Sequence, residues 1–347
     1  MNFELLREKR VLVTGGTGFV GRHLLPLLTK AGARVTCLAR VSSRTDHLPA
    51  GVKVAWADLQ TGVGLAQALS GQDIVIHLAV LLFGLGWQDY LGANSRAAAI
   101  LANALAREER VERAVLVSSL AVAGPCAIGP GIAEDALPMP VSAYGWSKLL
   151  VEQTLSAPRE LDGKLVILRP PIIYGSGDKG LLPVFRGAAK GIAVSPGVFR
   201  EFPVSVAHAH DVARAVLCCC APEAGGVYHL NDGVEHTMSD FCRVMGLALY
   251  RLTGRPAAGR VRVLYLPLPV MAVTAALATG LARLVACFTN FSSAPNWNMD
   301  KYREARQAGW LADAGRIRRE LDWKPEITLQ DGLEEAVEGY RREGLLL

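Results

Sequence analysis

The sequence predicts an α/β fold, a doubly wound parallel sheet with a smaller C-terminal subdomain. Over the first two-thirds of the 347 residues, short β-rich runs alternate with helical stretches, and a glycine-rich turn at 14–21 follows the first run. Hydrophobic residues make up 51% of the chain, which supplies a sizeable core and excludes disorder. Because a parallel connection needs a crossover, this alternation indicates helices on both faces of the sheet.

The expected elements follow in order, each helix or loop connecting two strands. Strands are expected at 10–14, 34–39, 52–56, 74–78, 114–118 and 165–169, and helices at 18–31, 64–69, 92–109 and 143–155. Beyond Gly175 the pattern is irregular, with a helix at 211–220, a strand at 226–230 and helical material toward the end. We therefore assign 1–175 to the sheet domain, with 204–231 returning to it, and assign 176–203 and 232–347 to the smaller subdomain.

The stretch VLVTGGTGFVG at 11–21 lies between the first strand and the first helix, with glycines at 15, 18 and 21. Without side chains the backbone turns tightly, and a pyrophosphate can approach the amides at the helix start, where the helix dipole favours negative charge. A glycine pattern alone is weak evidence, but the strand before it and the helix after it supply the required context. The loop therefore predicts a dinucleotide-binding domain of the Rossmann type.

The end of the second strand indicates which dinucleotide is bound. An acidic residue there binds the ribose hydroxyls of NAD, whereas an arginine accommodates the 2′-phosphate of NADP. The acid position is Ala39, followed by Arg40, Ser42, Ser43 and Arg44, so NADP is preferred over NAD. The alternative is that both arginines are solvated loop charges. Asp58, after the third strand, is a candidate for the adenine amino group or for a helix cap.

Tyr144 and Lys148 lie four residues apart at the start of a helix, so their side chains share one face. A nearby ammonium lowers a tyrosine pKa, which suits a phenol that exchanges a proton with an alcohol or ketone. Ser119 follows a strand of the same sheet, 25 residues before Tyr144. The three side chains are expected to converge at the carboxyl edge of the sheet, where open α/β folds bind ligands.

In these motifs the chain resembles the extended short-chain dehydrogenases/reductases, often described as NAD-dependent epimerases/dehydratases. The resemblance covers nearly the whole chain, through TGGTGFVG, WADL, DIVIHLAV, SSLAVAG, YGWSK, LRPPIIYGSGD, VAHAHDVARA and ELDWKPEITLQDGL. It implies that Tyr144 is the general acid/base, that Lys148 orients the nicotinamide ribose, that Ser119 holds the substrate oxygen and that Asn94 is structural. The expected cofactor contacts are Gly15, Thr17, Gly18, Phe19, Val20, Arg40, Asp58, Leu59, Leu78, Ala79, Tyr144, Lys148 and Pro171.

Departures from the family pattern narrow the range of possible substrates. Leu120 and Ala121 stand where sugar dehydratases carry an acidic pair, and Ile172 stands where many nucleotide-sugar members carry a diphosphate-binding asparagine. An isoleucine donates no hydrogen bond, so phosphate beside it is unfavourable. The chain is closest to the hydroxysteroid-dehydrogenase-like and dihydroflavonol-reductase-like branch. An apolar substrate pocket is indicated by two segments, LAVLLFGLGW after the fourth strand and the uncharged stretch 263–282, although core packing is the alternative for both.

The stretch 263–282 carries no charge over twenty residues, which is the length of a membrane span. Pro267 and Pro269 interrupt its first third and Arg283 follows it, so a helix is expected from about Val270. Two interpretations stay open. The helix is buried or caps the substrate, or 263–288 makes a peripheral contact with a membrane.

Charge and cysteine content bear on partners and compartment. The net charge of +5 is spread along the chain, without basic runs interleaved with aromatics, so nucleic-acid binding is not expected. The seven cysteines lack paired C-x-x-C spacing and read as reduced structural thiols, and the N-terminus shows no signal region. A cytoplasmic protein is expected. His208 and His210 have no apparent third ligand, so no metal is expected.

These observations predict an NAD(P)-dependent oxidoreductase that transfers a hydride between nicotinamide and a secondary alcohol or ketone of a largely apolar small molecule. Two alternatives remain: a nucleotide-sugar epimerase that retains its cofactor, and a cofactor-binding protein without catalysis. The family resemblance also implies a homodimer through the helices at 92–109 and 143–155.

Overall fold

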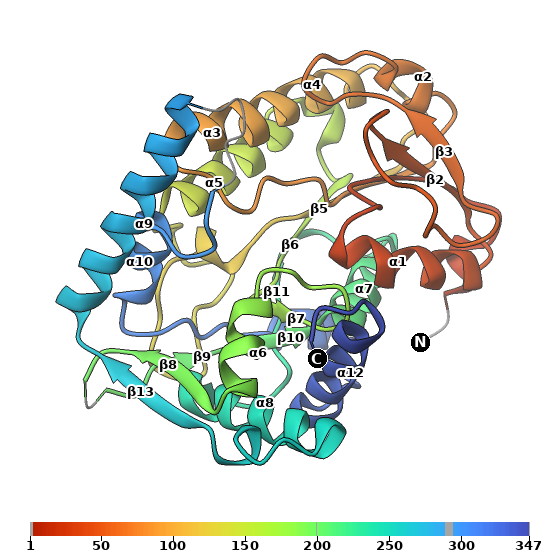
Figure 1. Cartoon of the computed structure of the whole chain (residues 1–347). Helices are drawn as coiled ribbons and strands as arrows, with labels where there is room; N and C mark the ends of the chain where they lie inside the picture. Colours follow the sequence, from red (N-terminus) through yellow and green to blue (C-terminus); the bar gives the residue numbers. More distant parts are fainter. Residues whose placement is uncertain (1–2, 199, 289–293, 347) are drawn as a thin grey trace.

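The computed structural model describes residues 3–198, 200–288 and 294–346. Its centre is a parallel sheet of seven strands in the order β11-β6-β5-β4-β1-β2-β3 (Figure 1). The strand order reverses between β1 and β4, which creates a crevice at the carboxyl ends of these strands. The strands are β1 (Arg10–Thr14), β2 (Arg34–Ala39), β3 (Lys53–Trp56), β4 (Ile74–His77), β5 (Arg113–Val117), β6 (Leu165–Arg169) and β11 (Gly226–His229).

Helices cover both faces of this sheet, as a doubly wound fold requires. Alternation within β1 shows why: Val11 and Val13 pack into the core beneath α1 and α7, whereas Leu12 packs into the opposite core with α4 and α5. The helices are α1 (Phe19–Lys30) and α7 (Ala209–Cys218) on one face, and α2 (Leu65–Leu69), α4 (Arg96–Leu105) and α5 (Ala143–Ser156) on the other.

The predicted fold class is confirmed, and every predicted strand is present within one residue of its expected bounds. The helix expected at 92–109 is wrong in its bounds. The chain enters it earlier, through α3 (Trp87–Tyr90) and a π-helical turn (Leu91–Ser95), and α4 ends at Leu105. Asn94 lies in that turn and binds the backbone of Leu81, which explains why the helix does not run straight through.

The remaining residues form a second layer of small sheets and helices beside the carboxyl edge of the main sheet (Figure 1). Its core combines aliphatic and aromatic side chains: Phe185 and Tyr340 meet edge to face at 4.9 Å between ring centroids, and Tyr174 and Phe241 pack nearby. The paired strands are β7 (Ile172–Tyr174) with β10 (Val206–His208), β8 (Ile192–Pro196) with β13 (Arg262–Leu266), and β9 (Pro203–Val204) with β12 (His236–Thr237). The helices are α6 (Leu182–Ala189), α8 (Met238–Thr253), α10 (Met299–Ala305) and α12 (Leu329–Arg342), whereas α11 (Gly315–Leu321) packs into the core of the main sheet.

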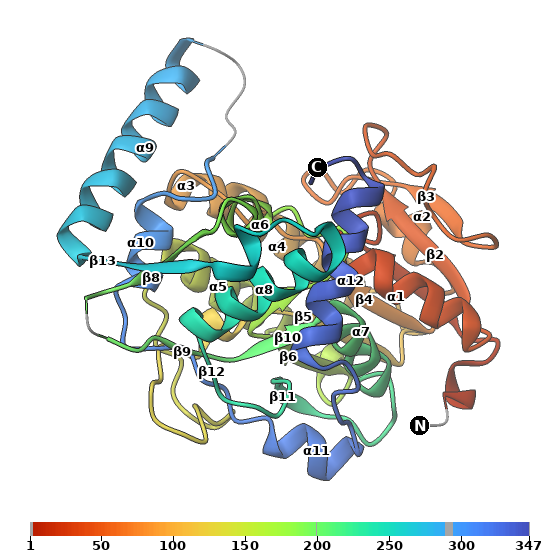
Figure 2. The same ribbon diagram turned by 60° about the horizontal axis from the view of Figure 1, so that its bottom comes forward.

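The apolar stretch 263–282 does not begin as a helix. Its first residues form β13, and the helix α9 (Leu268–Phe288) starts two residues before the expected Val270 and continues past Arg283. Figure 2 shows α9 standing out from the body of the molecule. The interpretation of α9 as a buried helix is wrong, because its buried residues are only Met271, Ala275 and Thr279.

Candidate active site

A cleft of about 1240 Å³ lies at the carboxyl edge of the main sheet, beside the ends of the neighbouring strands β1 and β4. The loops that follow β1, β2, β4 and β5 line one half of it, and residues of β8, α6, α9 and α10 line the other half. The cleft therefore joins the two layers of the protein. All the residues predicted to contact a cofactor, from Gly15 to Pro171, and all three predicted catalytic residues lie on its wall.

The loop after β1 is shaped to hold a negatively charged group. Gly15 adopts φ +71°, and a Cβ there would lie 2.6 Å from the amide nitrogen of Ala79, so only glycine fits. A Cβ on Gly21 would lie 2.1 Å from the carbonyl oxygen of Gly16, so this glycine lets α1 approach the loop. No side chain caps α1 at Gly18, which leaves the first amides of the helix available. These features fit a dinucleotide pyrophosphate.

The far end of this half of the cleft holds the residues predicted to select the dinucleotide. Ala39, Arg40 and Ser43 follow β2 on the wall of the cleft, and Arg40 is exposed. Arg44 is not part of the wall and pairs with Asp46 instead. Asp58 lies on the wall after β3, where its carboxylate accepts a hydrogen bond from the Gln60 amide. No carboxylate occupies the Ala39 position.

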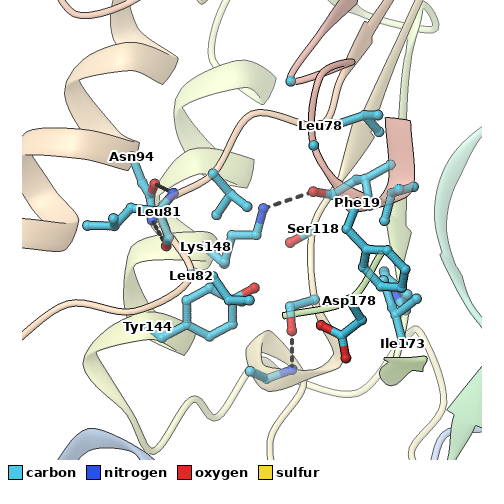
Figure 3. A pocket seen from close by; sticks show the side chains of 18 of the residues that line it. Phe19, Leu78, Leu81, Leu82, Asn94, Ser118, Tyr144, Lys148, Ile173 and Asp178 are labelled. Carbon is cyan, nitrogen blue, oxygen red and sulfur yellow. Dashed lines mark hydrogen bonds between the residues drawn. The ribbon is translucent and has the colours of Figure 1, made fainter. Parts of the chain in front are cut away.

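Tyr144 and Lys148 point from the first turns of α5 into the same cavity (Figure 3). The start of this helix is fixed by two buried acceptors: the Ser142 hydroxyl accepts from the Gly145 amide, and the Asp300 carboxylate accepts from the amides of Ala143 and Tyr144. Tyr144 is 7% exposed. The Asp300 carboxylate of α10 thus holds the first turn of α5, which carries the Tyr144 phenol.

Lys148 is buried, and its ammonium donates a hydrogen bond of 2.8 Å to the carbonyl oxygen of Val117 at the end of β5. Burial lowers the pKa of Lys148 to about 8, and the charge of Glu152 opposes this shift. Lys148 is therefore held at the carboxyl edge of the sheet by backbone, beside Ser118 and Ser119 on the wall of the cleft.

Burial raises the pKa of Tyr144, the reverse of the direction that the sequence predicted. Two groups oppose this effect: the ammonium of Lys301 and the hydroxyl of Ser119, which is a hydrogen-bond partner of the phenol. The Nζ of Lys301 lies 4.8 Å from the centre of the Tyr144 ring. The cation that favours ionised Tyr144 is thus Lys301, whereas the sequence had predicted Lys148 for this effect.

Lys301 and Glu304 are functional candidates that sequence reasoning does not find. They lie on α10 more than 150 residues beyond Tyr144, and the spacing of lysine and glutamate on a short helix carries no signal of its own. The two side chains form an ion pair of 2.9 Å, and Glu304 also accepts from Ser142 at 2.7 Å. Burial lowers the pKa of Lys301, but Glu304 and the nearby phenols raise it overall, so this ammonium stays charged.

Asn94 supports the loop that follows β4. Its side-chain oxygen accepts from the Leu81 amide at 2.7 Å, and its nitrogen donates to the Leu81 carbonyl (Figure 3). The same nitrogen also donates to the Ser147 hydroxyl. Ser147 lies on α5 between Tyr144 and Lys148. Asn94 therefore ties the cleft-lining loop to the helix that carries both predicted catalytic side chains.

The second half of the cleft is mainly apolar. Its polar side chains include Lys301, Glu304 and Asp178, and burial raises the pKa of Asp178 against the opposing hydrogen bonds from two loop amides. Ile172 lines the cleft, as do Leu120 and Ala121, which stand where dehydratases carry their acidic pair. The apolar wall includes Leu81, Leu82, Val184, Val194, Pro196, Phe202, Met238, Leu266, Met271, Trp297 and Trp310.

A comparison with models of known protein families identifies the family to which this fold and site belong. Residues 11–230 match the NAD dependent epimerase/dehydratase family. The chain belongs to this family. Among solved structures, it is similar in fold to gox2253, with a TM-score of 0.76 and 22% identity over 98% of this chain and 100% of that one.

Curated relatives of this epimerase/dehydratase family member cover nearly its whole length. The chain is 29% identical to a ceramide reductase of Caulobacter vibrioides, over 97% of this chain and 96% of the relative. It is 26% identical to a 4-hydroxy-2-methyl-3-oxo-4-farnesyl-3,4-dihydroquinoline-1-oxide ketoreductase of Stigmatella aurantiaca, over 94% and 95%. It is 24% identical to a UDP-glucose 4-epimerase of Vibrio cholerae, over 96% and 95%.

Family membership and site geometry agree on the class of chemistry. The chain is an NAD(P)-dependent enzyme of the extended short-chain dehydrogenase/reductase type, an oxidoreductase or an epimerase. The loop at Gly15 and the free start of α1 fit the pyrophosphate of the cofactor. Among the described residues there is no group of three histidine, cysteine or acidic side chains arranged to hold a metal.

Proposed function

We propose that the protein is an NADP-preferring oxidoreductase that interconverts a ketone and a secondary alcohol in a largely apolar, lipid-like substrate. One observation carries this proposal: the Tyr144 phenol is buried between a dinucleotide-binding loop and an apolar chamber in the same cleft. A substrate oxygen near this phenol would have its hydrocarbon portion among leucine, methionine, phenylalanine and tryptophan side chains.

The bound nicotinamide supplies or accepts the hydride. Tyr144 donates a proton to the substrate oxygen in reduction and accepts it in oxidation. Ser119, a hydrogen-bond partner of the phenol, holds that oxygen, and the ammonium of Lys148 orients the cofactor ribose. Lys301 stabilises the negative charge that develops on Tyr144 when the proton has left.

The cofactor preference rests on the end of β2. Arg40 and Ser43 lie on the cleft wall with no carboxylate at Ala39, so a 2′-phosphate meets a guanidinium and a hydroxyl there. An NAD ribose would find no acceptor for its two hydroxyls at that position. This supports NADP over NAD.

The substrate class rests on the chamber and on the relatives. By their names, the first relative is a reductase of ceramide, a lipid, and the second is a ketoreductase of a farnesyl-bearing quinoline oxide. The main competing function is a nucleotide-sugar epimerase, which the relationship to the UDP-glucose 4-epimerase favours. Ile172 on the cleft wall argues against it, because an isoleucine offers no hydrogen bond to a diphosphate.

A substrate screen tests the proposal. Oxidation of NADPH and of NADH is followed at 340 nm with long-chain 3-oxo lipids, ketosteroids and UDP-glucose, and thermal stability is measured with each compound. We expect turnover of a long-chain ketone with NADPH and no stabilisation by UDP. Stabilisation by UDP, with conversion of UDP-glucose to its 4-epimer and no net oxidation of NADPH or NADH, would establish the epimerase instead.

A further inference from the structure

Helix α9 exposes a continuous apolar surface. Its mean hydropathy reaches 1.8, and by length and composition it is the one helix in the described residues that could cross a membrane. A soluble monomer rarely exposes a contiguous surface of this kind unless a partner covers it. We call the following exposed side chains the α9 outer face: Val270, Val273, Leu277, Leu281, Leu284, Val285 and Phe288.

The opposite side of α9 is fixed to the protein. Thr274 accepts a hydrogen bond of 3.1 Å from the Trp297 indole, and Thr279 accepts one of 2.9 Å from the Met299 amide. Arg283 donates to the Leu85 carbonyl at 3.1 Å. A helix that crossed a bilayer would have to break all three contacts. As folded, α9 can bury only its outer face, which is the geometry of a helix lying in the plane of a membrane surface.

The sequence segment that contains α9 carries only positive charges, and two of its arginines are ion-paired, Arg243 with Asp240 and Arg251 with Glu334. Between Asp240 and Asp300 the chain has six arginines and no lysine or acidic residue. Arg255, Arg260 and Arg262 are exposed and precede α9 closely, and no ion pair is found for them in the described part of the chain. Exposed arginines attract anionic lipid headgroups, and these three lie at or before the start of β13, the strand that leads into α9. The same charges would repel a second copy of this surface, which disfavours self-association as its role.

The α9 outer face adjoins the candidate active site. Met271 and Thr274 line the cleft from the inner side of α9, together with Trp297 and Leu266. Close to the other end of α9, Trp87 is exposed on α3, which follows the Leu85 carbonyl bound by Arg283. One helix thus separates an apolar outer surface from an apolar inner chamber.

We propose that α9 docks the protein on an anionic lipid bilayer as an interfacial anchor and that an amphiphilic substrate moves from that bilayer past α9 into the cleft. Docking follows from the outer face and the arginines alone. Passage of a substrate rests in addition on the function proposed above.

Vesicle flotation of the full chain tests docking. We expect the protein to float with vesicles of phosphatidylcholine and phosphatidylglycerol at 7:3, and to float less with phosphatidylcholine alone or in 0.5 M salt. Leu277→Glu/Leu281→Glu should lower binding at least tenfold. The matched control is Ile128→Glu/Leu137→Glu, which places two charges at even more exposed positions outside α9 and should bind normally. Circular dichroism melting verifies that each variant folds.

Two results would overturn docking. One is a wild-type protein that stays at the bottom of the gradient whichever vesicle is used. The other is a Leu277→Glu/Leu281→Glu variant that floats as well as its control. Replacing Arg255, Arg260 and Arg262 by Gln should abolish the preference for anionic vesicles. Light scattering of the glutamate variant, if it showed a dimer converted to a monomer, would assign the α9 outer face to self-association and contradict the proposal.

Activity measurements separate docking from the reaction. The Leu277→Glu/Leu281→Glu variant should reduce a short, water-soluble ketone at the wild-type rate. Its rate should fall at least tenfold when the same ketone group is carried by a lipid in vesicles. Equal losses on both substrates would contradict delivery through the bilayer. Failure of the wild type on every ketone, with vesicle binding intact, would leave docking in place and refute the proposed function.

Discussion

Tyr144 has the position of an acid/base group, but its surroundings oppose its ionisation. Burial raises the pKa of this phenol, and Lys301 and Ser119 offset that rise only in part. A raised pKa suits a phenol that must hold a proton until it is transferred to a ketone. The residue that sets this balance is Lys301, whose ammonium lies over the ring.

Replacing Lys301 should therefore change the pH dependence of the reaction. Lys301→Met removes the ammonium that favours the tyrosinate, so the pKa of Tyr144 rises further and the oxidation rate reaches its midpoint at a higher pH. Lys301→Arg keeps the charge and should keep the wild-type profile. The measurement is kcat for alcohol oxidation from pH 6 to 10. If neither variant changes the pH profile of kcat, Lys301 has only a structural role.

Ala39 should decide between the two dinucleotides. Ala39→Asp places a carboxylate beside the Arg40 position, where it accepts from the NAD ribose and repels a 2′-phosphate. We expect KM to rise about tenfold for NADPH and to fall for NADH, as for one charged hydrogen bond of about 1.5 kcal/mol. Arg40→Ala is the matched variant and should raise KM for NADPH without lowering KM for NADH. Unchanged preference in both variants would contradict the role given to this end of β2.

At the scale of elements, the start of α5 is the feature on which the site depends. Asp300 is buried, and its carboxylate accepts the first two amides of the helix that carries Tyr144 and Lys148. Since Asp300 and Lys301 are neighbours on α10, one short helix both caps α5 and places a cation over the phenol. The C-terminal subdomain thus completes a site whose proton-transfer group belongs to the sheet domain.

Asp300→Ala should lower both stability and activity. Two buried amides lose their acceptor, so we expect a loss of about 2 kcal/mol in the free energy of unfolding. We also expect kcat to fall, because the first turn of α5 loses its anchor. Asp240→Ala, in the first turn of the distant helix α8, is the control for the loss of an acidic residue near a helix start. Denaturant unfolding and kcat measure the two effects, and a stability loss with unchanged kcat would contradict this coupling.

At the scale of the whole molecule, the sequence predicts the sheet better than the second layer. Strands of the main sheet have apolar runs that end in glycine or polar residues, and local pattern suffices to place them. The short strands β9 and β12 have two residues each and exist only because they pair with each other, so no local pattern marks them. The same reason hides Lys301, since its partner Tyr144 is brought near by the fold alone.

The assembly of the molecule is a further prediction. We propose a homodimer through α4 and α5, where Trp146 is 43% exposed on the outer side of α5. Light scattering in detergent-free buffer should give twice the chain mass of 37.1 kDa. Trp146→Glu should reduce it to the monomer mass, because a buried charge is unfavourable in an interface. A wild-type monomer at micromolar concentration would refute this assembly.

The central claim is that Tyr144 transfers a proton to or from the oxygen of a lipid-like ketone or alcohol. Tyr144→Phe removes only the hydroxyl and leaves the ring beneath Lys301. The most direct measurement is NADPH oxidation with a long-chain ketone by the wild type and by this variant, with NADPH affinity measured in parallel. We expect kcat to fall about 100-fold or more while NADPH affinity is unchanged. A variant that retains more than about a tenth of the wild-type rate would contradict the assignment.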